Sequence, residues 1–119
     1  MEVIRLKGHA YEQKLYHRLV LASIDMYPKF ELGDINYKFS YKINATQLFV
    51  REKYYDEIDL DLLKNLLDNF KTEILKKKIR ELSIDNFVTG PNVNLWDDIV
   101  ELIENTFRFT PVTIYIYEN

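Results

Sequence analysis

The chain has 119 residues, of which 47% are hydrophobic and 29% are charged, and we expect a single globular domain over residues 1–119. The formal net charge of −3 argues against a nucleic-acid-binding protein, and the absence of cysteine excludes disulfides and thiolate zinc sites. No apolar stretch approaches the roughly 20 residues that span a bilayer and the N-terminus lacks a signal-peptide pattern, so we expect a cytoplasmic protein without a membrane partner.

The first half of the chain predicts a strand, a helix and a hairpin. Residues 3–7 alternate apolar and charged side chains, as in a half-buried strand. Over residues 10–27, apolar side chains recur every three or four positions and predict an amphipathic helix that ends at Pro28. Residues 35–43 carry the clearest strand alternation, and a turn after them leads into a returning strand over residues 47–51.

The second half predicts two helices and a closing strand. Asp59 caps a long helix, whose buried face consists of Leu63, Leu66, Leu67, Phe70 and Ile74. Residues 83–92 are expected to form a loop, and Asn94 to cap the last helix. Residues 112–117 alternate again as the last strand. The predicted order is therefore βαββααβ.

Several short motifs along this order are similar to those of tunnelling-fold (T-fold) pterin enzymes. They are Asn36-Tyr37, Asp59-Leu60-Asp61-Leu62-Leu63-Lys64, Pro91-Asn92-Val93-Asn94-Leu95 and Ile116-Tyr117-Glu118, which resemble 6-pyruvoyl-tetrahydropterin synthase, and Ile4-Arg5-Leu6-Lys7-Gly8 and Asn94-Leu95-Trp96-Asp97, which resemble dihydroneopterin aldolase. This resemblance implies an α+β subunit with an antiparallel four-stranded sheet, helices on one face, and assembly into a homo-oligomer.

The resemblance implies a pterin-like small-molecule ligand held by acidic and aromatic side chains. A carboxylate can accept two adjacent N–H groups of a pterin ring. Glu118 matches the position of the anchoring glutamate in the synthases, and Asp97 lies near that of the aldolases. Trp96 could stack on the ring. The alternatives are a solvated chain end for Glu118, a helix N-terminal charge for Asp97 and a core position for Trp96.

Candidate catalytic groups are His9, His17 and Tyr54, which could transfer protons to or from the substrate. Their alternatives are ordinary exposed or core histidines and a tyrosine that packs a loop. The synthases bind zinc through three histidines, but this chain has only two, so we expect no cofactor unless a carboxylate completes a zinc site.

The resemblance therefore implies a pterin-binding lyase of folate or tetrahydropterin biosynthesis. Two alternatives remain open: a T-fold protein that binds a ligand without catalysis, and a small viral or mobile-element protein-interaction domain.

Overall fold

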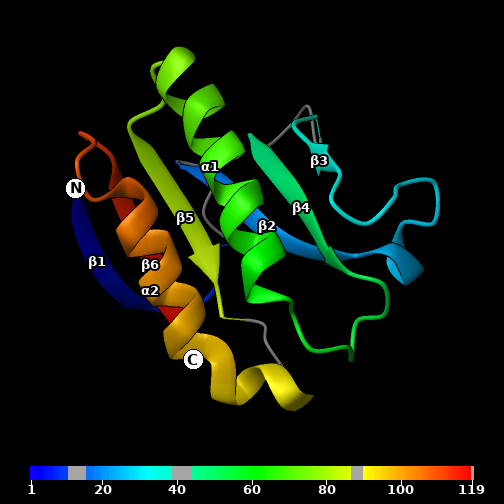
Figure 1. Cartoon of the computed structure of the whole chain (residues 1–119). Coiled ribbons are helices and arrows are strands. Elements are labelled where there is room, and N and C mark those ends of the chain that lie inside the picture. The colour runs from blue at the N-terminus through cyan, green and yellow to red at the C-terminus, as the bar shows by residue number, and fades with distance from the viewer. Residues whose placement is uncertain (11–15, 39–43, 87–89, 119) are drawn as a thin grey trace.

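The chain forms one six-stranded sheet with two α-helices (Figure 1). The structure is a computed structural model, and it describes residues 1–10, 16–38, 44–86 and 90–118. The strands are β1 (Glu2–Lys7), β2 (His17–Ser23), β3 (Ile35–Asn36), β4 (Ala45–Arg51), β5 (Glu81–Asp85) and β6 (Thr113–Glu118). The helices are α1 (Leu60–Lys76) and α2 (Trp96–Phe107), with short 3-10 helices η2 (Ile24–Met26) and η3 (Gly90–Leu95).

The sheet is mostly parallel, which contradicts the predicted antiparallel four-stranded sheet. Its strand order is β1-β6-β5-β2-β4-β3, and all neighbours pair in parallel except β3, which runs antiparallel to β4. Figure 1 shows both α-helices packed over the same face of the sheet. Parallel pairing follows from the connections, because α1 and α2 each carry the chain back to the starting edge before the next strand begins.

The two helices bury the stripes expected from the sequence. Asp59 caps α1 by accepting hydrogen bonds from the backbone N–H groups of Asp61 and Leu62. The buried face of α1 consists of Leu63, Leu66, Leu67, Phe70 and Ile74, as predicted. The second helix starts at Trp96 rather than beside Asn94, because η3 occupies the preceding residues, and its cap residue Leu95 makes no side-chain hydrogen bond.

Two central strands were missed by the sequence prediction. The predicted helix over residues 10–27 is wrong in its described part, since His17–Ser23 is strand β2 and residues 11–15 lie outside the described ranges. The predicted loop from residue 83 is also wrong at its start, where β5 runs to Asp85. Of the long strand predicted over residues 35–43, only Ile35 and Asn36 pair with β4, and residues 39–43 lie outside the described ranges.

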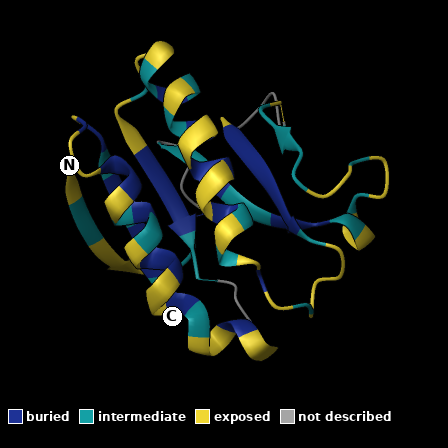
Figure 2. Cartoon of the chain, viewed as in Figure 1, coloured by how far each residue is buried: buried dark blue, intermediate teal, exposed yellow. Residues whose placement is uncertain are grey.

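These strands are hard to recognise because neither has one clean polar face. Figure 2 shows that most of β5 is buried, as expected for a central strand of a parallel sheet. The apolar run from Leu19 to Ala22 in β2 has the same apolar content as a helical stripe, so periodicity alone does not separate the two structures. In the described ranges, no helix is both long and apolar enough to cross a membrane.

Replacing Phe70 by alanine should destabilise the fold strongly. Phe70 is fully buried in α1, and its ring lies edge-on to Phe107 of α2 with centroids 6.2 Å apart. We expect Phe70→Ala to lower the free energy of unfolding by about 3–5 kcal/mol, measured by urea denaturation. Thr72→Ala on the exposed side of α1 is the control, and a loss for Phe70→Ala no larger than that of the control would contradict this packing.

Candidate functional site

The order in which strands are added to the sheet reverses at its centre, between β2 and β5. Strands β2 and β5 are neighbours, but the chain continues from β2 to β4 on one side and from β5 to β6 on the other. Ligands of open parallel sheets bind outside the carboxyl ends of the strands at such a point, because the diverging connections leave a crevice there. The topology therefore marks the carboxyl ends of β2 and β5 as the candidate site.

A pocket lies beside this point, at the carboxyl end of β5 and along residues 18–21 of β2. It has an empty volume of about 360 Å³, its opening to solvent included, and the residues that line it are Arg18, Leu19, Val20, Leu21, Arg51, Asp85 and Trp96. The pairing of β2 with β5 ends at Leu19 opposite Ile84, so that the next residues of β2 extend past the end of β5 and border the crevice. Four elements thus meet around the pocket: β2, the ends of β4 and β5, and the start of α2.

Asp85 and Arg18 form an ion pair on the pocket wall. Nε of Arg18 lies 3.4 Å from Oδ2 of Asp85, and the side chains are only 16% and 4% exposed. Asp85 also accepts a hydrogen bond from the backbone N–H of Ala10, which ties the segment after β1 to the end of β5. A carboxylate so deeply buried needs such partners, and they hold it at a defined position beside the pocket.

Arg51 is a second cation at the pocket, and part of its guanidinium lacks hydrogen-bond acceptors. Its Nε and Nη1 atoms are buried, and neither has a hydrogen-bond partner among the described residues. Burial lowers the pKa of Arg51, while the nearby carboxylates of Asp25 and Asp56 act in the opposite direction. A guanidinium stays charged at any physiological pH. Two N–H groups of this guanidinium thus lack an acceptor in the described part of the chain.

A β-bulge in β4 lies directly before Arg51 and affects the position of its side chain. Ala22 pairs with Phe49, but the next residue of β2, Ser23, pairs with Arg51, so that β4 contains one extra residue at this point. Such a bulge changes the direction of the side chain that follows it, and bulges are common beside functional sites. The bulge thus contributes to the placement of the guanidinium at the end of the strand.

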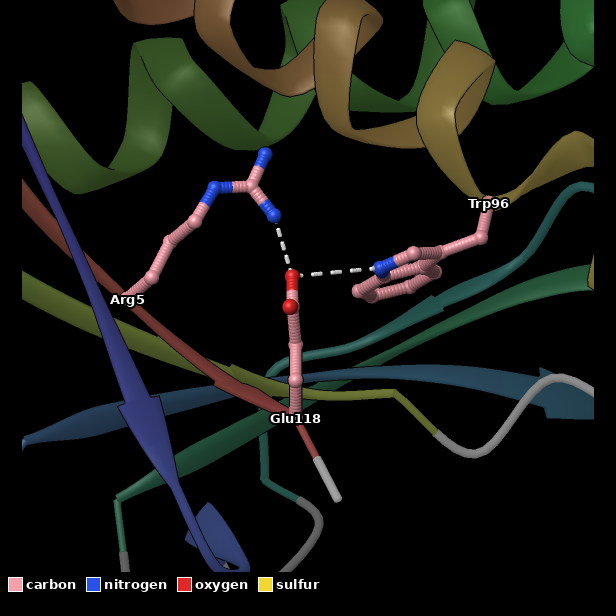
Figure 3. A network of polar contacts seen from close by, with 3 residues as sticks. All are labelled: Arg5, Trp96 and Glu118. Carbon is pink, nitrogen blue, oxygen red and sulfur yellow. Dashed lines mark hydrogen bonds and ion pairs between the residues drawn. The ribbon is translucent and has the colours of Figure 1, made fainter.

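Trp96 closes the pocket from the helical side and contacts Glu118 (Figure 3). Trp96 is 7% exposed, and its Nε1–H donates to Oε1 of Glu118 across 3.5 Å. The same oxygen accepts from Nη1 of Arg5 in an ion pair. The Glu118 carboxylate is thus directed at two donors of its own chain, one of which is a wall of the pocket.

A buried asparagine joins the two loops that flank the pocket. Asn92 in η3 is fully buried; its Oδ1 accepts from the backbone N–H of Ile58 across 2.8 Å, and its Nδ2 donates to the backbone carbonyl of Asp56 across 2.7 Å. These bonds fix the segment before α2 against the segment after β4. The sequence placed Asn92 in a predicted loop and in a motif that resembled a helix start, and it did not indicate these bonds because the partners are distant in sequence.

The structure does not gather the remaining predicted site residues around this pocket. His17 lies at the amino end of β2, and Tyr54 is exposed in the loop after β4, beside Tyr55. Asp97 is exposed in the first turn of α2, and His9 is half-buried just after β1. Roles for these residues in chemistry stay predictions. Within the described ranges, no three acidic or histidine side chains are placed to share a metal ion.

The chain was compared with protein families, curated sequences and solved structures, and solved structures share its fold. The chain matches no protein-family model and no curated protein sequence. The macrodomain of Thermus aquaticus DarG superposes with a TM-score of 0.71 at 9% identity, over 98% of each chain. Thermosipho africanus DarTG in complex with ADP-ribose gives 0.71 at 10% identity, over 100% of this chain and 42% of that one. The macrodomain of Mycobacterium tuberculosis DarG gives 0.70 at 12% identity, over 97% of this chain and 96% of that one.

These similarities establish the macrodomain fold and correct the family resemblance. The T-fold prediction is wrong, because a T-fold subunit would need the antiparallel sheet that this chain lacks. The pterin ligand, the lyase activity and the place in folate biosynthesis were inferred from that resemblance alone, and they are withdrawn with it. The two alternatives, a T-fold binding protein and a viral or mobile-element interaction domain, are likewise unsupported.

His17 should make stability depend on pH although it lies away from the pocket. Its Nε2 lies 2.7 Å from Oγ1 of Thr46, and burial, aided by nearby Lys77, lowers the pKa of His17 to about 4. The unfolded chain takes up this proton near pH 6.5. The contribution of neutral His17 to the free energy of unfolding is therefore complete above pH 6.5 and is lost as the pH falls toward 4.

Comparison with His17→Gln isolates this effect, because glutamine can bond to Thr46 but does not titrate. Between pH 7 and pH 4, we expect the wild type to lose roughly 1–2 kcal/mol more unfolding free energy than the variant, after allowance for partial exposure. Urea denaturation at each pH provides the measurement. A stability difference that stays constant with pH would show that His17 titrates normally.

Proposed function

We propose that this chain binds ADP-ribose in the pocket formed by β2, the carboxyl ends of β4 and β5, and the start of α2. What supports the proposal most is Arg51, whose buried N–H groups lack an acceptor at the edge of the crevice. The similarity to Thermosipho africanus DarTG, a protein solved in complex with ADP-ribose, suggests which anion this could be. Fold similarity alone would not support a ligand; the argument depends on its agreement with the pocket.

The charge of the ligand matches the cations of the pocket. The diphosphate of ADP-ribose carries negative oxygens, and a guanidinium donates two parallel N–H bonds to such a group. Glycine-rich loops that cradle phosphate with backbone N–H groups are not available in this chain, because its three glycines, Gly8, Gly33 and Gly90, are widely separated. Side-chain cations, Arg51 above all, therefore take the role of anion donors in this proposal.

The other walls suit the uncharged parts of the ligand. Trp96 offers a flat apolar surface, Leu19 and Leu21 are apolar, and the Asp85 carboxylate can accept from an amino or hydroxyl group. A few polar groups on a mostly apolar lining are typical of a site that fixes the orientation of its ligand.

Isothermal titration calorimetry with the wild type and Arg51→Gln tests the proposal. We expect the wild type to bind ADP-ribose and the variant to bind it about 10- to 100-fold more weakly, since a charge-assisted hydrogen bond contributes about 1.5–3 kcal/mol. Adenosine, which lacks the diphosphate, should bind equally weakly to both proteins. Raising the salt concentration should weaken ADP-ribose binding more for the wild type than for the variant.

The matched control is Arg80→Gln. Arg80 is exposed and precedes β5, at the opposite end of the strand from the pocket, so its loss removes the same charge without touching the site. The Arg80→Gln variant should bind ADP-ribose with the affinity of the wild type. The proposal fails if the wild type shows no binding heat at millimolar ligand, or if the two arginine variants bind alike.

A further inference from the structure

We infer that Glu118 is a positioning residue that fixes Trp96 as a wall of the ligand pocket, an inference that rests on the proposed function. Figure 3 shows the Glu118 carboxylate between the guanidinium of Arg5 and the indole of Trp96. Of these residues only Trp96 lines the pocket. Glu118 would therefore act on the ligand through the indole rather than by contact.

Trp96 needs a fixed partner because the start of α2 is not otherwise held by a cap. The N-cap position is Leu95, which has helical backbone angles and no side-chain hydrogen bond. The bond from the indole N–H to Glu118 connects the first residue of α2 to the end of β6. A nearly buried indole N–H normally requires an acceptor, so removal of this carboxylate favours a different ring position.

Arg5 in turn orients Glu118. Lys7 of β1 is directly opposite Glu118, and Arg5, two residues earlier, points to the same face of the sheet and reaches the carboxylate diagonally. The side chains of Arg5 and Glu118 are 49% and 33% exposed, so the pair contributes little to overall stability. Its effect is to restrict the rotamers of Glu118, which keeps the acceptor oxygen in line with the indole.

The predicted consequence is a loss of ligand affinity without a loss of fold. In Glu118→Ala the ring is free to leave the pocket wall, whereas Glu118→Gln keeps an amide oxygen that can accept from Nε1. Glutamine should therefore preserve most of the function and alanine should not. A purely electrostatic role of the carboxylate predicts the opposite, namely that both variants lose affinity alike.

Intrinsic fluorescence tests the inference directly, because Trp96 is the only tryptophan in the chain. Without ligand, we expect Glu118→Ala to shift the emission to longer wavelength and to increase acrylamide quenching about twofold, as a nearly buried indole becomes hydrated. Glu118→Gln and the control Glu101→Gln, an exposed carboxylate on α2, should keep the wild-type emission. Far-UV circular dichroism verifies that each variant is folded.

Calorimetry with ADP-ribose completes the test. We expect Glu118→Ala to bind about 10-fold more weakly and Glu118→Gln to stay within about threefold of the wild type. The inference is overturned if Glu118→Ala keeps the wild-type emission, or if its emission changes while its affinity does not. If the wild type itself fails to bind ADP-ribose, the proposed function fails, and the ligand-free emission still decides whether Glu118 holds Trp96.

Discussion

The position of the pocket depends on one topological constraint. The strands β2 and β5 are parallel neighbours, but the chain leads from β2 toward one edge of the sheet and from β5 toward the other. Because β5 ends while β2 continues, the sheet cannot close at this point, and the loops that leave it diverge. Helices α1 and α2 pack over one face and keep the two strands in register. The described residues that line the crevice therefore belong to the strands β2, β4 and β5 and to the first residue of α2.

The polar groups around the crevice fall into two kinds. Asp85, Asn92 and Glu118 are bonded to partners in their own chain, and these bonds hold β5, η3 and α2 against one another. Arg51 is different, because two of its nitrogen atoms are buried without an acceptor in the described ranges. Leaving buried donors unpaired costs stability, and proteins tend to carry such a cost where a ligand supplies the missing acceptor. Gln47 of β4 and Ser83 of β5 also have a buried side-chain atom without a hydrogen-bond partner in the described ranges, but among these three residues only Arg51 is charged and lines the pocket.

The sequence predicted the parts of the fold that have a single buried face. The stripe of α1 and its Asp59 cap were correct, because a period of 3.6 residues reports one apolar side. Strand β2 was mistaken for helix because apolar residues occupy both of its faces, and β5 was missed because it is short and includes polar Ser83. Without these central strands, the parallel sheet could not be derived, and weak motifs were matched to the wrong family.

The site was less predictable than the helices because it is assembled by topology. Asp85 contacts Ala10 across a sequence separation of 75 residues, and Arg51 reaches the pocket only because β4 lies beside β2. Trp96 was singled out for its ring, but its partner Glu118 was assigned to the ligand instead of the indole. The most direct test of the central claim is a titration of isotope-labelled protein with ADP-ribose, followed by amide chemical shifts. The account predicts that the shifts cluster at residues 18–21 of β2, at the carboxyl ends of β4 and β5 and at the start of α2; shifts confined to the amino end of β5 and the carboxyl end of α2, or none at saturating ligand, would contradict it.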